Sequence, residues 1–196
     1  MVSLVLYDHP RFTIDNSLSM SFSTLTTARF FLQQVLPEDQ QFIFEGLSHP
    51  AIIRFYGVRY DSFEATGKQM EWYEKIYEEG TGVAWKIVDK VSGERIGVVA
   101  YYFFKPHHRK AELGFWIFPQ FWNKGIVTEV LTTVIKYCQQ EIGIHRLEAS
   151  VEEGNVGSTK VLEKLGFSCE GIMKECEIKN GKYISVLIYA LIAGDK

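Results

Sequence analysis

Cysteine is scarce in this sequence, and its few positions exclude two classes of protein. The chain has three cysteines, Cys138, Cys169 and Cys176, with no C-x-x-C pair among them. An odd set of this kind builds neither a disulfide framework nor a cysteine zinc site. We therefore expect a protein of a reducing compartment, and the expected location is the cytoplasm.

Long apolar runs and an excess of one charge are also missing. No run of eighteen apolar residues occurs, so the sequence predicts no membrane-spanning helix. The apolar stretch at residues 2–7 has no basic segment before it and is followed by Asp8, which does not fit a secretory signal. With 21 Lys and Arg against 24 Asp and Glu, the net charge is -3. We therefore expect neither a membrane nor nucleic acid as a direct partner.

Apolar and aromatic side chains, in contrast, are plentiful. The 196 residues are 46% hydrophobic and 14% aromatic, which is enough to form a buried core. This length suits one domain better than two. No repeat, low-complexity tract or linker divides the chain, so we expect one domain over residues 21–196 and an N-terminal extension over residues 1–20.

Hydrophobic periodicity predicts an α+β fold. The period changes from near 3.6 to near 2 at Val83, and a strongly amphipathic helix follows at about residues 125–143. Strands are expected at residues 27–33, 83–89, 95–104, 110–118, 146–151, 167–177 and 183–192, and the other helices at 37–48, 62–80 and 155–165. The expected architecture is a central mixed, mostly antiparallel, twisted sheet flanked by helices.

The segment FWIFPQFWNKGIVTEVL, residues 115–131, joins a strand to the amphipathic helix through a short turn. The first amides of a helix lack acceptors and carry the positive end of its dipole, which suits a phosphate or pyrophosphate. Gly125 has no Cβ to obstruct a ligand, and Lys124 adds positive charge. A tight bend alone would also explain one glycine, so the junction by itself leaves both readings open.

A second segment, EGNVGSTKVLEKLGF at residues 153–167, places Asn155 and Ser158 at the start of a short helix. The two segments, at this spacing, resemble the cofactor motifs of the GNAT superfamily of acyl-CoA-dependent N-acetyltransferases. The wider pattern is most similar to the ribosomal-protein alanine N-acetyltransferase (RimJ/RimL-like) branch, through TARFFLQ, AELGFWI and EGIMKECEIKNGKY. The resemblance covers roughly residues 25–192 and implies a single GNAT-like domain.

This resemblance implies acetyl-CoA as the cosubstrate and no metal. It places the pantetheine arm along Phe115, Trp116, Ile117 and Phe118, and the pyrophosphate at Trp122, Asn123, Lys124, Gly125, Ile126, Val127 and Thr128, with Asn155 and Ser158 facing the cofactor. Only Gly125 fits the superfamily loop Q/R-x-x-G-x-G/A fully, since Trp122 and Val127 depart from it. Because backbone amides hold the pyrophosphate, side chains in the loop can vary. The adjacent His107 and His108 lack a third ligand at metal-binding spacing.

Three residues are candidates for the chemistry of acetyl transfer, in which the amine loses a proton and the leaving thiolate gains one. By the resemblance, Glu177 matches a base that acts through water, and Ser158 matches an acid for the thiolate. Glu112, on the strand before the loop, is the alternative base. Structural roles stay open for each: a solvated hairpin charge for Glu177, a capping hydroxyl for Ser158, and an ion-pair partner of Arg109 or Lys110 for Glu112. Glu177 is favoured, because the stretch around it matches the closer branch.

The acceptor is expected to be a primary amine that attacks the thioester directly in a ternary complex. By the resemblance, the favoured acceptor is the N-terminal amine of a protein, of the ribosomal-protein type. A polyamine, an amino sugar or an amino-acid-like amine is one alternative, and a non-catalytic acyl-CoA-binding or sensing module is another. The sequence also leaves a homo-oligomer open.

Overall fold

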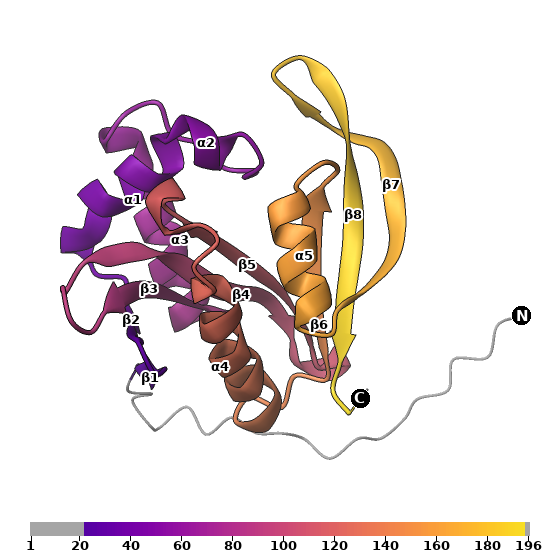
Figure 1. Cartoon of the computed structure of the whole chain (residues 1–196), viewed down its shortest axis with the longest axis horizontal. Helices are drawn as coiled ribbons and strands as arrows, with labels where there is room; N and C mark the ends of the chain where they lie inside the picture. The colour runs from indigo at the N-terminus through magenta and orange to yellow at the C-terminus, as the bar shows by residue number, and fades with distance from the viewer. Residues whose placement is uncertain (1–21, 195–196) are drawn as a thin grey trace, which may run out of the picture.

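An eight-stranded sheet in the order β1-β2-β3-β4-β5-β6-β8-β7 runs through the molecule (Figure 1). The computed structural model describes residues 22–194, and the expected extension over residues 1–20 lies outside them. Only β5 and β6 pair in parallel; the other neighbours are antiparallel. The strands are β1 Leu25–Thr26, β2 Phe30–Gln34, β3 Val83–Asp89, β4 Arg95–Lys105, β5 Lys110–Ile117, β6 Arg146–Glu152, β7 Ser168–Lys179 and β8 Lys182–Ile192.

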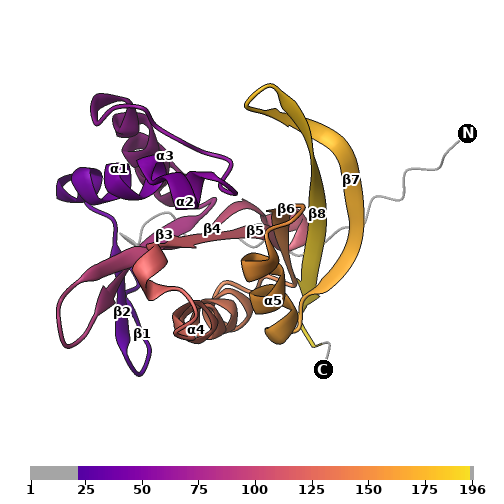
Figure 2. The same cartoon turned by 45° about the horizontal axis from the view of Figure 1, so that its top comes forward.

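Helices cover both faces of the sheet (Figure 2). One face carries α1 Gln40–Ser48, α2 Pro50–Ile53 and α3 Gly67–Glu78, and the other carries α4 Ile126–Gln140 and α5 Val156–Lys164. Short 3-10 turns lie at Pro37–Asp39, Glu64–Thr66, Pro106–His108 and Pro119–Phe121. The α+β class and the mostly antiparallel sheet expected from the sequence are confirmed.

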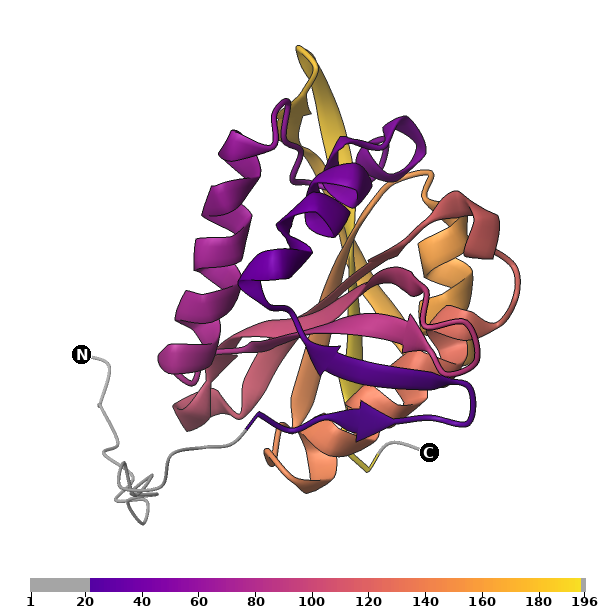
Figure 3. The same ribbon diagram turned by 90° about the vertical axis from the view of Figure 1, so that its left-hand side faces the viewer.

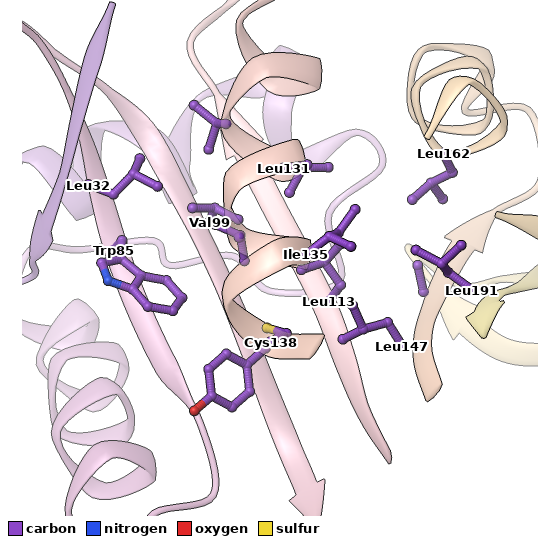
Figure 4. Packing of buried hydrophobic residues seen from close by; sticks show 14 of the residues in the cluster. Leu32, Trp85, Val99, Leu113, Leu131, Ile135, Cys138, Leu147, Leu162 and Leu191 are labelled. Atoms are coloured by element: carbon purple, nitrogen blue, oxygen red, sulfur yellow. The ribbon is translucent and has the colours of Figure 1, made fainter. Parts of the chain in front are cut away.

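The main core lies between the sheet and α4 (Figure 4). Leu131 and Ile135 of α4 pack toward Val99 and Leu113 of the sheet, and Cys138 is fully buried beside them. This matches the amphipathic pattern of the sequence, whose apolar positions recur at the helical period. A second core, which contains Trp116, fills the space under α1 and α3.

The sequence placed most elements correctly, and two need correction. Residues 27–29 form a turn between β1 and β2, not part of a strand, because the Thr27 hydroxyl accepts a hydrogen bond from the Phe30 amide at 3.0 Å. The helix expected at residues 37–48 does end at Ser48, but Pro50 starts the unpredicted helix α2. The His49 side chain caps that helix by accepting from the Ala51 amide, and proline is favourable at the first helical position.

Candidate active site

The loop between β5 and α4 leaves a run of backbone amides unpaired. Asn123 (φ 58°) and Gly125 (φ 69°) both adopt the left-handed conformation, and Gly125 is the N-cap of α4. The amides of residues 123–128 donate to no acceptor within residues 22–194, whereas the Glu129 amide already bonds to the Gly125 carbonyl. A run of free amides at a helix N-terminus is the arrangement that binds phosphate groups.

Four side chains of this loop contact other parts of the protein. The indole of Trp122 donates to the Ile117 carbonyl at 3.0 Å, and the Lys124 ammonium lies 5.5 Å from the centre of the Phe121 ring. Ile126 is buried, and Val127 packs partly against the main core. The Trp122 hydrogen bond therefore ties the loop back to β5, and the backbone amides are the groups available to a ligand.

A clamp from the turn between β1 and β2, which no pattern in the sequence indicated, holds this loop. Glu129 of α4 accepts hydrogen bonds from the Thr27 hydroxyl at 2.7 Å, the Arg29 amide at 2.9 Å and the Arg29 Nε at 2.7 Å. The Arg29 guanidinium also donates to the Lys124 carbonyl at 3.2 Å. Burial opposes ionisation of Glu129, but the hydrogen bonds from Thr27 and Arg29 lower its pKa. Figure 3 shows the β1-β2 hairpin at the edge of the sheet, turning beside the start of α4.

We expect Glu129→Gln to weaken coenzyme A binding about three- to tenfold, because hydrogen bonds to a charged group are among the stronger ones and their loss loosens the loop. Calorimetric titration with coenzyme A measures this. Glu141→Gln, at the other end of the same helix, is the matched control and should bind normally. Equal affinity in both variants would show that the clamp does not support the loop.

The strands β5 and β6 separate next to this loop. They are paired only from Lys110 to Glu112 on β5, opposite Arg146 to Glu148 on β6. Beyond this point, residues 113–117 of β5 have no partner on the β6 side, while β4 still pairs with them on the other side. A free strand edge presents unpaired backbone groups, and an extended ligand can pair with them.

The side chains of residues 115–118 are not equally accessible at this edge. Trp116 is 3% exposed and packs against Gly46 of α1, where an added Cβ would lie 2.2 Å from the indole ring. Ile117 is also buried, and Phe115 and Phe118 are partly buried against the two cores. The contact of Trp116 and Ile117 with a cofactor stays a prediction, and their buried side chains leave only backbone atoms to make it.

Glu112 lies where the two strands separate. It is half-buried, and no side chain within residues 22–194 forms a hydrogen bond or an ion pair with it. The partners considered from the sequence are used elsewhere: Arg109 donates to the Gly143 carbonyl, and Lys110 pairs with Glu148 at 2.9 Å. Burial first, and then the charge of Glu148, raise the pKa of Glu112.

Two neighbours of Glu112 also have shifted pKa values. The Tyr102 hydroxyl is kept neutral, because burial and then the charge of Glu112 raise the pKa of Tyr102 to about 12. Burial would raise the pKa of Glu148, but hydrogen bonds from Arg146 and Lys110 outweigh it and lower that pKa. Of these two carboxylates, Glu148 is neutralised by two cations and Glu112 is left to take up a proton.

Glu177 lies on β7, opposite Ile184 of β8, and its side chain is exposed. Paired residues point to the same face of a sheet. Through the register of β7, β8, β6 and β5, Glu177 therefore shares the face of Glu112, which is the face covered by α1 and α3. The hairpin is tied to α2, since the Lys179 ammonium donates to the Arg54 carbonyl at 2.7 Å.

Asn155 and Ser158 have different roles at the start of α5. The Asn155 side chain accepts a hydrogen bond from the Ser158 amide at 3.2 Å and caps the helix. The hydroxyl of Ser158 is half-buried and bonds to no residue in the part of the chain that the structure covers. The capping explanation therefore applies to Asn155, while the Ser158 hydroxyl is available to a ligand.

Within residues 22–194, no group of three or more His, Cys, Asp or Glu side chains is placed to hold a metal ion. None of the helices in that range is long and apolar enough to cross a membrane.

A mixed sheet that opens between two parallel strands, beside a helix whose first amides are unpaired, is the arrangement expected of an acyl-CoA-dependent acyltransferase. Residues 29–168 match the family described as acetyltransferase (GNAT) domain. The chain therefore belongs to the GNAT acetyltransferases, and it is an N-acetyltransferase whose cosubstrate is acetyl-CoA. The expected family is confirmed, and so is the expectation that the protein is an enzyme.

Similar proteins include several bacterial acetyltransferases. The chain is 30% identical to Uncharacterized N-acetyltransferase YoaA of Bacillus subtilis over 87% of this chain and 97% of that protein. It is 25% identical to the ribosomal-protein-serine acetyltransferase of Escherichia coli, over 82% and 85% of the two chains. The spermidine N(1)-acetyltransferase of the same organism is 24% identical, over 74% and 76%.

Solved structures share the fold. RimL, a ribosomal L7/L12 alpha-N-protein acetyltransferase determined in complex with coenzyme A, superposes with a TM-score of 0.79. The identity is 22%, over 87% of this chain and 98% of RimL. At this identity the likeness supports the architecture of the domain.

Proposed function

We propose that this protein transfers an acetyl group from acetyl-CoA to the N-terminal amine of a protein, with Glu112 as the base. The observation that carries the proposal is the position of Glu112. It is a half-buried carboxylate without a partner, at the point where β5 and β6 separate and on the same strand that leads to the free amides. A base must lie close to the attacking amine and must be ionised when it acts.

In this proposal, one set of residues binds the cofactor and another set transfers protons. The amides of residues 123–128 hold the pyrophosphate, and the free edge of residues 113–117 aligns the pantetheine arm by backbone hydrogen bonds. Acetyl-CoA supplies the acetyl group as an activated thioester. Glu112 accepts the proton of the amine, directly or through one water, and the Ser158 hydroxyl donates a proton to the departing thiolate.

Glu112 is preferred to Glu177 for two physical reasons. Its raised pKa brings it closer to neutral pH, where a general base is most effective. Its position on β5, next to the strand opening, is also fixed by pairing on both sides. Glu177 is exposed on a hairpin strand, so the assignment favoured from the sequence stays a prediction that the comparison of variants decides.

We expect Ser158→Ala to lower kcat about tenfold and to change the affinity for coenzyme A little, since a general acid acts in the transition state. Asn155→Ala is the contrasting variant, because removing a helix cap costs about 1 kcal/mol of unfolding free energy. Steady-state kinetics and urea unfolding separate the two effects. A Ser158→Ala protein that loses stability and keeps its kcat would show a structural hydroxyl.

The favoured acceptor is supported by the relative that carries ribosomal-protein-serine acetyltransferase activity in its name. The relative named as a spermidine acetyltransferase supports the small-amine alternative. The test is acetyl-CoA turnover with peptides that bear a free N-terminal amine, with the same peptides blocked at that amine, and with spermidine. Turnover confined to spermidine would overturn the protein-amine proposal.

A further inference from the structure

A cavity of about 480 Å³ lies beside Glu112, at the opposite end of β5 from the cofactor loop. Its walls come from α3, the end of β4, the start of β5, and β6, and include Trp72, Lys75, Phe103, Lys105, Glu112 and Glu148. Phe103 is 54% exposed and adopts φ 52°, at a bulge where β4 shifts its register against β5. The cavity therefore meets the proposed base on one side and solvent on the other.

The charges that line this cavity are mostly compensated. Glu148 pairs with Lys110 at 2.9 Å and with Arg146 at 2.7 Å. Lys75 lies 3.8 Å from Glu79 on the same helix. Two charges of opposite sign remain. Lys105 forms no ion pair with any residue between 22 and 194, and Glu112 likewise has none.

The two charges that form no ion pair within residues 22–194 lie on one face of the sheet, close to each other. Lys105 is paired with Lys110, and Lys110 precedes Glu112 by two positions on β5, so all three side chains share a face. Two residues of a strand span about 7 Å. If a bound ligand places its ammonium group beside Glu112 and its carboxylate beside Lys105, the distance between these two ligand groups is one that one or two residues of a peptide cover.

We propose that this cavity holds the part of the acceptor next to the reacting amine, and that the preferred acceptor carries a carboxylate there. The inference rests on the proposed function and specifies its substrate class. A free acidic amino acid and a protein whose first or second residue is Asp or Glu share this chemistry. A polyamine does not, because its second ammonium group would meet Lys105, the lining cation that forms no ion pair within residues 22–194.

The aromatic walls fit the same substrate. Trp72 packs edge-on against Tyr102 with ring centroids 5.5 Å apart, and Tyr102 lies opposite Glu112 in the β4-β5 register. Of the aromatic residues, Trp72, Phe103 and Phe104 line the cavity itself, and their rings limit the access of water to a bound main chain, which strengthens the charge interactions at both ends. We therefore expect Lys105 to determine the selectivity for a carboxylate, whereas Glu112 acts as the base for every acceptor.

The experiment compares kcat/KM for four acceptors: peptides that are identical except for Glu, Gln or Lys at the second residue, and free glutamate. The Glu peptide should be preferred over the Lys peptide by about tenfold or more. Lys105→Glu should reverse this preference. Lys136→Glu changes the net charge equally from an exposed position on α4, and it should keep the preference of the unaltered protein.

The outcomes separate this inference from the proposed function. Absence of turnover with every amine would contradict the proposed function. Turnover of the peptides with equal kcat/KM, or a preference that survives Lys105→Glu, would overturn the cavity assignment alone. Free glutamate as the better acceptor would support the cavity assignment and contradict the protein-amine acceptor, whereas the Glu peptide as the better acceptor would support both. Lys105→Met removes the charge without reversing it. Its preference between the Glu and Lys peptides should lie between that of the unaltered protein and that of Lys105→Glu.

Discussion

Replacing Glu112 with Gln is expected to lower kcat at neutral pH by about 10² to 10⁴, the usual contribution of a general base. Gln has nearly the same shape but accepts no proton. Activity should recover in part at high pH, where more of the amine is already neutral. Initial rates of coenzyme A release, measured across pH with a saturating peptide amine, test this.

Glu177→Gln is the matched comparison, because both substitutions remove a carboxylate from the same face of the sheet. It should change kcat by less than about threefold if Glu112 is the base. Loss of activity in Glu177→Gln alone would restore the assignment favoured from the sequence. Full activity in both variants would mean that the amine arrives deprotonated from solvent, so that catalysis rests on proximity and oxyanion stabilisation.

The raised pKa of Glu112 also predicts a change in stability, with a definite sign. The folded protein holds the Glu112 proton at pH values where the unfolded chain has lost it, because burial and Glu148 oppose ionisation while Lys110 and Lys105 favour it. The free energy of unfolding therefore falls as pH rises from the ordinary value of 4.5 through the raised pKa. Glu112→Gln removes this dependence. The free energy of unfolding of the variant, relative to that of the unaltered protein, should therefore increase as pH rises to neutral, and urea unfolding measures it.

Gly125→Val should weaken coenzyme A binding by about 100-fold or more, because a left-handed β-branched residue is strained and its side chain projects into the ligand's path. Gly125 has φ 69°, and an added Cβ would have only Arg29, at 4.0 Å, as a neighbour in the described structure. The space beside it is thus open to a phosphate. Calorimetric titration with coenzyme A gives the affinity directly.

Gly93→Val controls for backbone strain. Gly93 has nearly the same conformation, φ 72°, in the turn between β3 and β4, and no atom lies within 4 Å of its added Cβ. The two variants should lose similar stability, but only Gly125→Val should lose affinity. Normal coenzyme A binding by a folded Gly125→Val protein would show that the pyrophosphate does not bind at this loop.

The local elements were predictable because their signals are local. The apolar spacing from Ile126 to Cys138 specified α4 to within a few residues, and Asn180-Gly181 marked the turn between β7 and β8. The glycine before α4 likewise indicated the free amides, since a helix N-terminus leaves its first donors unpaired in any context.

Contacts between distant segments were not predictable. Thr27 and Arg29 are about 100 positions from Glu129, and nothing in either segment specifies the other. The sequence also suggested Arg109 and Lys110 as partners of Glu112, because they are its neighbours along the chain. In the structure Lys110 reaches Glu148 on the adjacent strand, which leaves Glu112 without a partner.

By itself, the sequence determined the class of fold, the order of its elements and the unpaired amides before α4, since these follow from periodicity, turn chemistry and helix ends within short segments; the resemblance of two short motifs indicated the family. The tertiary structure alone decided which charges are compensated, that Trp116 belongs to the core, and that β5 and β6 separate at Glu112. The reason is physical: a side chain's pKa and its availability depend on burial and on partners that the fold brings together from separate strands.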